Sequence, residues 1–315
     1  MRQFSNPTFF TMQNLYQKLL EVEQLAKSSK MKRLFARPLY YIYGMFFSKC
    51  IYPIRKKGVW ANAETFFGKP MKVLLPSGLD IFLVKGKSHD SEIRLAKFIL
   101  NYLSEGDTFI DVGANFGYFS LLASQIVGEQ GSVFAYEASL NNYKVLEKNT
   151  ENEKNIQRFH RAIADKDNEK VHFFEFPILF SEYNTLDTKL FEKEKWFLKN
   201  PAKAIEVESI TLDTLIFLQK ITPKIIKIDV EGKEEMAISG ANKLLATQSP
   251  YIVLEYLSKE RYNENHQNAT KLLEKADFLP HFINDEGKLE ICQNVENFLN
   301  SRNLYSDNIV FVKKN

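Results

Sequence analysis

The stretch over residues 107–137 constrains the fold more than any other part of this chain. It opens with a short apolar run at 108–110, which is typical of a strand buried on both faces of a parallel sheet. Gly113 and Gly117 then permit a tight turn, after which apolar residues recur at helical spacing. A second buried strand ends on Glu137, about twenty residues past the turn, where a carboxylate can accept both hydroxyls of a ribose. The stretch therefore predicts a βαβ nucleotide-binding unit.

The turn sequence, D-V-G-A-N-F-G, argues against a dinucleotide ligand. A dinucleotide pattern counted from the first glycine would need glycines where this chain has Asn115 and Tyr118. The carboxylate of Asp111 repels phosphate, but it suits a ligand with an ammonium and a sulfonium group. S-adenosylmethionine carries both, together with a ribose. We therefore predict an S-adenosylmethionine site made by Asp111, Gly113, Asn115, Gly117 and Glu137.

Strands and helices alternate along the rest of the chain. Residues 156–164 predict a third strand, whose end near the adenine makes Ala162 a candidate cofactor contact. Further core strands are predicted at 224–228, 251–254, 278–283 and 308–312, with extra strands at 171–176 and 204–209. The pattern predicts a doubly wound, Rossmann-like α/β fold with seven core strands, whose ligands lie at the carboxyl ends of the strands.

Three features outside the core strands also carry predictions. A hairpin is expected from strands at 73–75 and 81–84 around P-S-G-L-D, followed by an amphipathic helix at 90–103. N-caps are expected at Ser139 and Thr211. Residues 177–203 form a long polar and aromatic insertion, which is either a lid over the acceptor or a disordered segment.

A second group of carboxylates follows the later strands. Asp229 and Glu231 lie in K-I-D-V-E-G, and Glu255 ends the next strand. Transfer of a methyl group to an alcohol requires removal of the acceptor proton, by a base or with help from a bound metal. We take Asp229, Glu231 and Glu255 as catalytic candidates, acting as bases or as ligands of a divalent cation. The alternative is that Asp229 and Glu231 only cap the helix that follows.

Charge is distributed unevenly over the 315 residues. The net charge is +3, but residues 1–60 hold eleven Lys and Arg against two Glu, or +9, which leaves −6 for the rest. We predict a basic helical extension over 1–60 and a catalytic domain over 61–315. The aromatic-rich stretch at 39–54 is shorter than the about 20 residues that span a bilayer. It either packs on the domain or lies on an anionic membrane surface.

Cysteine use and the first residues bear on location. Cys50 and Cys292 are far apart and lack metal-ligand spacing, which fits a reducing compartment. The start, M-R-Q-F-S-N-P, lacks the apolar core of a signal peptide. We expect a cytoplasmic protein, peripheral on the inner face of the membrane if the extension binds lipid. The frequent Lys and Asn suggest a bacterial source with an AT-rich genome.

Several motifs together resemble the FkbM family of S-adenosylmethionine-dependent methyltransferases. They are D-V-G-A-N-F-G-Y-F-S-L-L-A, V-F-A-Y-E, R-A-I-A-D, I-T-L-D-T-L and K-I-I-K-I-D-V-E-G-K-E, within residues 90–257. The resemblance implies a class I methyltransferase fold and O-methylation of a hydroxyl on a sugar, glycan or secondary metabolite. It also implies that the glycine turn and Glu137 bind the cofactor, and that Asp229 and Glu231 belong to the D-V-E-G motif.

Two other classes of function stay open at this stage. One is a nicotinamide-dependent oxidoreductase, which Asn115 and Tyr118 disfavour. The other is a catalytically silent scaffold that keeps the fold and binds a membrane or a partner. Nucleic acid is not expected as a substrate, because neither an N-P-P-Y or D-P-P-Y motif after the fourth core strand nor a Pro-Cys pair occurs in the sequence. The acceptor, its hydroxyl position and the oligomeric state are left open.

Overall fold

The structure is a computed structural model that describes residues 7–177, 179–180, 184, 196–230, 232–261 and 263–314. Most of the insertion predicted at 177–203 lies outside these residues, so its interpretation as a lid stays a prediction. The catalytic candidate Glu231 also lies outside them.

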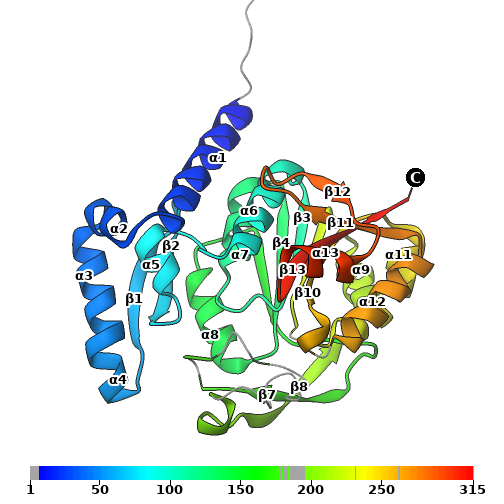
Figure 1. Cartoon of the computed structure of the whole chain (residues 1–315). Coiled ribbons are helices and arrows are strands. Elements are labelled where there is room, and N and C mark those ends of the chain that lie inside the picture. Colours follow the sequence, from blue (N-terminus) through cyan, green and yellow to red (C-terminus); the bar gives the residue numbers. More distant parts are fainter. Residues whose placement is uncertain are drawn as a thin grey trace, which may run out of the picture.

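An eight-stranded sheet forms the centre of the molecule (Figure 1). In spatial order its strands are β12 (Leu289–Ile291), β11 (Phe278–Ile283), β13 (Ser306–Lys313), β10 (Tyr251–Leu257), β9 (Ile225–Ile228), β3 (Thr108–Val112), β4 (Ser132–Glu137) and β5 (Ile156–His160). The strands from β10 to β5 are parallel, whereas β13 is antiparallel to both of its neighbours. Seven of the strands are the predicted core strands, and β12 is a short addition at one edge. The strand order reverses between β3 and β9, which is where a doubly wound sheet binds its ligands.

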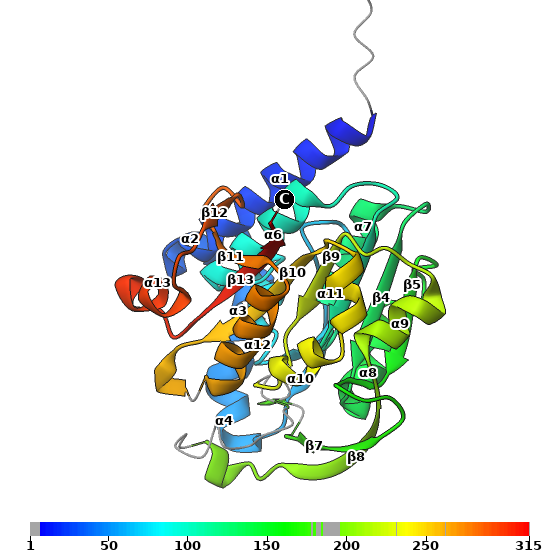
Figure 2. The ribbon, with the colours of Figure 1, turned by 90° about the vertical axis from the view of Figure 1, so that its right-hand side faces the viewer.

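Helices cover both faces of the sheet (Figures 1 and 2). One face carries α6 (Asp90–Tyr102), α7 (Tyr118–Val127) and α8 (Leu140–Asn149). The other carries α9 (Leu212–Gln219), α10 (Glu234–Ser239), α11 (Asn242–Thr247), α12 (Glu264–Lys275) and α13 (Val295–Arg302). Phe109 and Ile110, adjacent on β3 and wholly buried, pack in the cores on opposite faces, as alternation along a strand requires. The near-continuous apolar runs of the core strands follow from this burial on both sides.

Both predicted N-caps are present. The Ser139 hydroxyl accepts a hydrogen bond from the Asn142 amide at 3.2 Å, and the Thr211 hydroxyl accepts one from the Thr214 amide at 3.0 Å. Each satisfies an amide that has no partner within its own helix. The two caps fix where α8 and α9 begin.

The predicted hairpin is wrong. Residues 81–84 belong to a helix, α5 (Leu79–Val84), and β2 (Pro70–Leu75) pairs instead with β1 (Val59–Glu64), which the sequence pattern did not reveal. All four side chains from Ile81 to Val84 are buried. A short, continuous apolar run of this kind does not separate a buried helix from a buried strand.

The predicted third strand divides into two. The chain leaves the main sheet after β5, and β6 (Ala162–Ile163) joins a small sheet with β8 (Lys203–Ile210) and β7 (Lys170–Glu175). In Figure 1 β7 and β8 lie below the main sheet. The described residues also include the 3₁₀ turns η4 (Phe197–Lys199) and η5 (Lys259–Arg261).

The extension before residue 60 is helical, with α1 (Pro7–Ala26), α2 (Lys30–Ala36), α3 (Pro38–Phe46), a π-helical turn η1 (Phe47–Ile51) and α4 (Tyr52–Arg55). Part of it belongs to the core of the domain, because Leu15 and Leu19 are buried in the same cluster as α6. Glu23 of α1 also pairs with the buried Lys97 of α6 at 2.6 Å. The boundary predicted at residue 60 falls inside β1, which begins at Val59.

Candidate active site

Four residues stand in a row along the carboxyl edge of the sheet. The parallel ladders that join β4, β3, β9 and β10 end level, at Tyr136, Val112, Ile228 and Leu254. Glu137, Gly113, Asp229 and Glu255 are the residues that follow these four in the chain. Neighbouring strands lie about 4.8 Å apart, so the order and spacing of the row are set by backbone hydrogen bonds. The row crosses the point where the strand order reverses.

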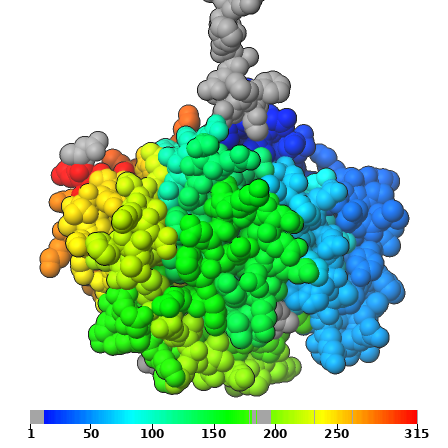
Figure 3. Space-filling model, turned by 180° about the vertical axis from the view of Figure 1, so that it is seen from behind, coloured from blue at the N-terminus to red at the C-terminus, as the bar shows by residue number. Residues whose placement is uncertain are grey.

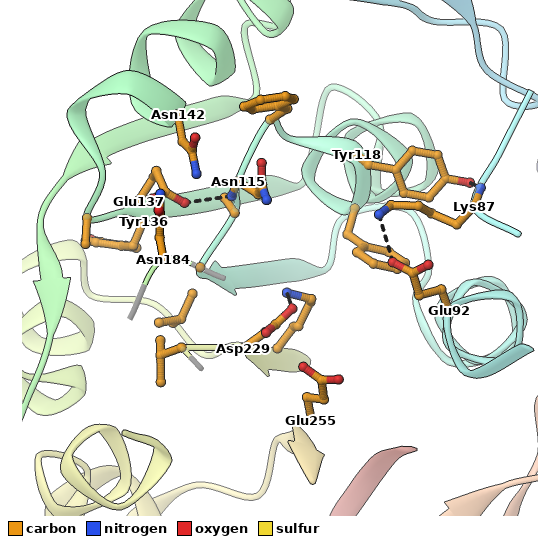
Figure 4. Close-up of a pocket in the computed structure, with 18 of the residues that line it drawn as sticks. Lys87, Glu92, Asn115, Tyr118, Tyr136, Glu137, Asn142, Asn184, Asp229 and Glu255 are labelled. Carbon is orange, nitrogen blue, oxygen red and sulfur yellow. Dashed lines mark hydrogen bonds and ion pairs between the residues drawn. The ribbon is translucent and has the colours of Figure 1, made fainter. Parts of the chain in front are cut away.

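A cavity of about 470 Å³ opens over this row. Of the predicted site residues, Gly113, Asn115, Glu137, Ala162, Asp229 and Glu255 line it. In Figure 4 Glu137 and Asn115 lie on one side of it, and Asp229 and Glu255 lie on another. The structure thus brings together most of the cofactor and catalytic candidates, which the sequence places far apart, whereas Asp111 and Gly117 do not line the cavity.

The carboxylate of Glu137 is buried and held by backbone amides. One oxygen accepts a hydrogen bond from the Asn115 amide and the other from the Ser139 amide, each at 2.8 Å. Burial raises the pKa of Glu137 to about 7, and the two amide bonds act in the opposite direction. Each oxygen keeps a free lone pair, so the side chain is oriented to accept two further hydrogen bonds from neighbouring hydroxyls.

The two glycines of the turn adopt positive φ angles. Gly113 has φ +74° and Gly117, the N-cap of α7, has φ +89°. A Cβ on Gly117 would lie 2.7 Å from the side chain of Leu146 on α8. Both positions therefore favour glycine, which reaches positive φ without strain. Asn115 adopts φ +51° between them, a conformation that asparagine tolerates better than most residues.

Asp111 lies beneath the cavity. Its side chain is 1% exposed, accepts a hydrogen bond from the Ser120 hydroxyl at 2.7 Å, and lies 3.5 Å from the amine of Lys227. The same amine pairs with Asp229 at 3.1 Å. Burial lowers the pKa of Lys227, but the charges of Asp229 and Asp111 outweigh it and raise that pKa above its usual range. Lys227 is thus a fixed cation between a buried and an accessible carboxylate.

Asp229 and Glu255 differ in their surroundings. The side chain of Asp229 is 34% exposed, paired with Lys227 and directed to the cavity. Burial and the negative charge of Asp229 raise the pKa of Glu255 to about 8, which a hydrogen bond with Ser306 partly offsets. A carboxyl group with such a pKa can take up a proton near neutral pH, the property that a general base needs.

Sequence reasoning missed the pair that holds the loop after β9. The Glu234 carboxylate accepts hydrogen bonds from the amides of Val230 and Gly232, and its second oxygen lies 3.1 Å from Nε2 of His266. Both side chains of the pair are 1% exposed. Glu234 follows D-V-E-G-K, so an acidic residue just past the motif was an available signal. Nothing in the sequence pointed to His266 as its partner.

A polar part of the remaining lining comes from α5, the loop before α6 and the first turn of α6. The amine of Lys87 pairs with Glu92 at 2.8 Å, and Nδ1 of His89 lies 2.7 Å from the hydroxyl of Ser91 (Figure 4 shows the first pair). Asp80 accepts hydrogen bonds from the amides at 81 and 88. No motif marks these residues in the sequence. Among the described residues, no three His, Cys, Asp or Glu side chains gather in a way that would hold a metal ion.

A protein-family model matches the part of the chain that carries this site. The model of the FkbM methyltransferase domain matches residues 111–280, from the end of β3 into β11, and so covers the whole row at the strand ends. The chain belongs to the FkbM methyltransferase family. It is a methyltransferase with the class I fold, as the motifs predicted, and S-adenosylmethionine is the methyl donor of such enzymes.

Solved structures with similar folds are distant in sequence. The FkbM methyltransferase from Methylobacillus flagellatus is 13% identical with a TM-score of 0.41, and the match covers 75% of this chain and 52% of that one. The S-adenosylmethionine-dependent O-methyltransferase from Thermotoga maritima is 16% identical with a TM-score of 0.39, covering 83% and 80%. An rRNA methylase from Streptococcus thermophilus is 7% identical with a TM-score of 0.39, covering 73% and 99%. Among curated proteins none matches. The family assignment rests on residues 111–280.

Proposed function

We propose that this FkbM methyltransferase transfers the methyl group of S-adenosylmethionine to a hydroxyl group of a sugar or glycan. The observation that carries the proposal is the row Glu137, Gly113, Asp229 and Glu255 beneath one cavity. The residues present fit the cofactor. Glu137 offers two oriented oxygens to ribose hydroxyls, Gly113 leaves the turn free of a side chain, and Ala162 lines the side assigned to the adenine.

The chain's own residues supply the chemistry around the methyl group. S-adenosylmethionine, when bound, supplies an electrophilic methyl group on a sulfonium. Asp229 lies two strands from Glu137, accepts a hydrogen bond from the acceptor hydroxyl and orients it for in-line attack. Asp229 takes up this proton as the hydroxyl oxygen bonds to the methyl carbon, whose bond to sulfur breaks. Glu255, one strand farther, assists Asp229 in its deprotonated form. Glu231 remains a candidate that assists either group.

The acceptor class follows from the polar wall opposite the glycine turn. Side chains of Asp80, His89, Ser91 and Asn308 line it, with the Lys87–Glu92 pair at its edge. Many convergent hydrogen-bonding groups on one wall suit a polyhydroxylated molecule better than a flat apolar one. A hydroxylated secondary metabolite is the alternative acceptor that the same wall accommodates.

The proposed setting is the bacterial cytoplasm, at the inner face of the membrane, where a lipid-linked glycan presents its hydroxyls. The +9 charge of residues 1–60 supports this location. The same residues form the proposed extension, and residues 61–315 form the proposed catalytic domain.

A labelling experiment tests the proposal. The purified protein, S-adenosylmethionine labelled in the methyl group and glycan fractions from a cell envelope should give label in the glycan. The label should survive mild alkali, because a methyl ether is stable where a methyl ester is hydrolysed. Label released by alkali, or found only in amines, would contradict O-methylation of a hydroxyl. The same reaction with EDTA tests whether the carboxylates act as a base or as ligands of a divalent cation. Loss of turnover on chelation supports the cation, and unchanged turnover supports a base alone.

A further inference from the structure

The helices α2, α3, η1 and α4 form a ridge on the outside of the molecule, at the blue right-hand edge of Figure 3. Seven large apolar side chains on this ridge are between 48% and 83% exposed. They are Met31, Phe35, Leu39, Ile42, Tyr43, Phe46 and Ile54, and we call them the apolar stripe. Most recur every three or four residues, so they lie along one side of the helices. The exposed Cys50 continues the same spacing between Phe46 and Ile54.

The other side of the same helices is packed against the protein. Phe47 is buried in the core, the ring of Tyr40 lies 5.0 Å from that of Phe82, and a Cβ on Gly44 would lie 2.7 Å from Leu79 of α5. The ridge is therefore apolar on both sides, which is the pattern of a helix that is covered all round. Within the described part of the chain nothing covers the outer side. Exposed apolar patches of this extent mark interaction surfaces.

The charge around the stripe indicates what covers it. No acidic residue occurs between Glu23 and Glu64. Six exposed basic residues flank the stripe, namely Lys30, Lys32, Lys49, Arg55, Lys56 and Lys57. Apolar and aromatic side chains bordered by cations match the boundary between acyl chains and anionic headgroups.

We propose that the apolar stripe docks this protein on an anionic phospholipid membrane, with the ridge lying in the plane of the interface. None of the described helices has both the length and the apolarity to traverse a bilayer, and the inner side of the ridge is already occupied by α5. The stripe lies beside the candidate active site. Trp60 is six positions after Ile54, at most about 22 Å of chain, and the ring of Trp60 lies 5.9 Å from that of Phe116 in the glycine turn. The docking surface stands by itself, whereas its use in presenting a lipid-linked acceptor rests on the proposed function.

The test uses the full chain, because α1 and Phe47 belong to the core and a deletion would expose it. Binding to vesicles of phosphatidylcholine is compared with binding to vesicles that also contain phosphatidylglycerol. The test variant is Phe35→Ser/Leu39→Ser/Ile54→Ser, whose three side chains are each at least 75% exposed. The matched control is Phe217→Ser/Leu218→Ser/Ile291→Ser, with side chains 62–70% exposed on other elements. Circular dichroism, S-adenosylmethionine binding and light scattering are recorded for every variant.

The wild type and the control should bind the anionic vesicles and leave the neutral ones largely unbound, and salt should weaken the binding. The test variant should bind at least about tenfold more weakly while its fold and cofactor binding are unchanged. A wild type that ignores anionic vesicles, or a test variant that binds like the control, overturns the proposal. A wild-type dimer that becomes a monomer in the test variant, without vesicle binding, would assign the stripe to a second copy and overturns it too. Failure to methylate glycans contradicts the proposed function and leaves vesicle binding as an independent result.

Discussion

A methyl group placed on Gly113 would lie 1.8 Å from the backbone carbonyl oxygen of Asp229. The ends of β3 and β9 thus meet backbone to backbone, between the cofactor candidate Glu137 and the catalytic candidates Asp229 and Glu255. Gly113 also has φ +74°, so a side chain is disfavoured at this position both by the close approach and by the backbone conformation.

Gly113→Ala should therefore abolish the site. We expect cofactor affinity to fall by more than about a hundredfold and stability by about 2 kcal/mol or more, since clash and strain add. Calorimetric titration and thermal unfolding measure the two effects. Gly106→Ala is the matched control, because Gly106 has φ +87° but open space where its Cβ would lie. Equal behaviour of the two variants would show that the close approach to Asp229 is unimportant.

Glu137→Ala should weaken S-adenosylmethionine binding by about ten- to a hundredfold, the effect of losing charge-assisted hydrogen bonds to the ribose. Because the pKa of Glu137 is raised to about 7, the wild-type affinity should increase as the pH rises through that value. Glu137→Gln should remove this pH dependence. Glu147→Ala, on the exposed side of α8, serves as control. Wild-type affinity in Glu137→Ala would refute the ribose assignment.

Asp229→Asn should reduce kcat by about 10²–10⁴, the range for loss of a group that acts on the acceptor proton. Cofactor affinity should change by only a few fold, because Glu137 and the glycine turn remain. Single-turnover kinetics and calorimetry separate the two quantities. Unimpaired turnover would remove Asp229 from the reaction.

Glu255 predicts a specific dependence on pH. With a pKa raised to about 8, its base form increases as the pH rises, so kcat/KM should rise through that value and the rise should vanish in Glu255→Gln. Stability should move in the opposite direction. From the usual carboxyl pKa near 4.5 up to about 8, the folded protein keeps a proton that the unfolded chain has released, so rising pH destabilises the fold. Melting curves of wild type and Glu255→Gln across this range should diverge in favour of the variant.

Glu234 and His266 predict a positioning effect. Glu234→Ala leaves the amides of Val230 and Gly232 without their acceptor and should lower stability by about 2–4 kcal/mol. It should also lower kcat, because the loop after Asp229 loses its support. Glu234→Gln keeps an acceptor oxygen and should restore much of kcat. A purely structural role would lower the melting temperature in Glu234→Ala and leave kcat at neutral pH and moderate temperature unchanged.

The sequence revealed those parts of the fold in which local pattern and burial agree. The strands β3, β4, β9 and β10 begin as short apolar runs, and their order placed Glu137, Asp229 and Glu255 on one edge of the sheet. Ile81–Val84 was predicted as a strand but is helical. All four side chains are apolar, so the sequence shows neither the two-residue period of a strand nor the 3.6-residue period of a helix. Burial also hid the break at Arg161, where pairing changes from the main sheet to the small one.

Site residues that belong to one local motif could be predicted from the sequence. Contacts between residues far apart in the sequence could not. Lys227 was visible as a cation near Asp229, but its position 3.5 Å from Asp111 depends on the pairing of β3 with β9. The polar side chains of Lys87, His89 and Ser91 come from the loop before α6 and the first turn of α6, and neither carries a motif. His266 of α12 contacts Glu234. The two residues are 32 positions apart, and no local sequence pattern predicts such a contact.

The row at the strand ends has a consequence for how such an enzyme could be altered. Glu137 and Asp229 are two strand spacings apart, about 9.6 Å. The backbone hydrogen bonds that pair β4 with β3 and β3 with β9 fix this spacing. The segment around Ser88 and Ser91 enters the cavity from outside these paired strands. Under the proposed function, acceptor specificity and chemistry belong to separate parts of the molecule, and grafting that segment from a relative should exchange the acceptor while the reaction stays the same.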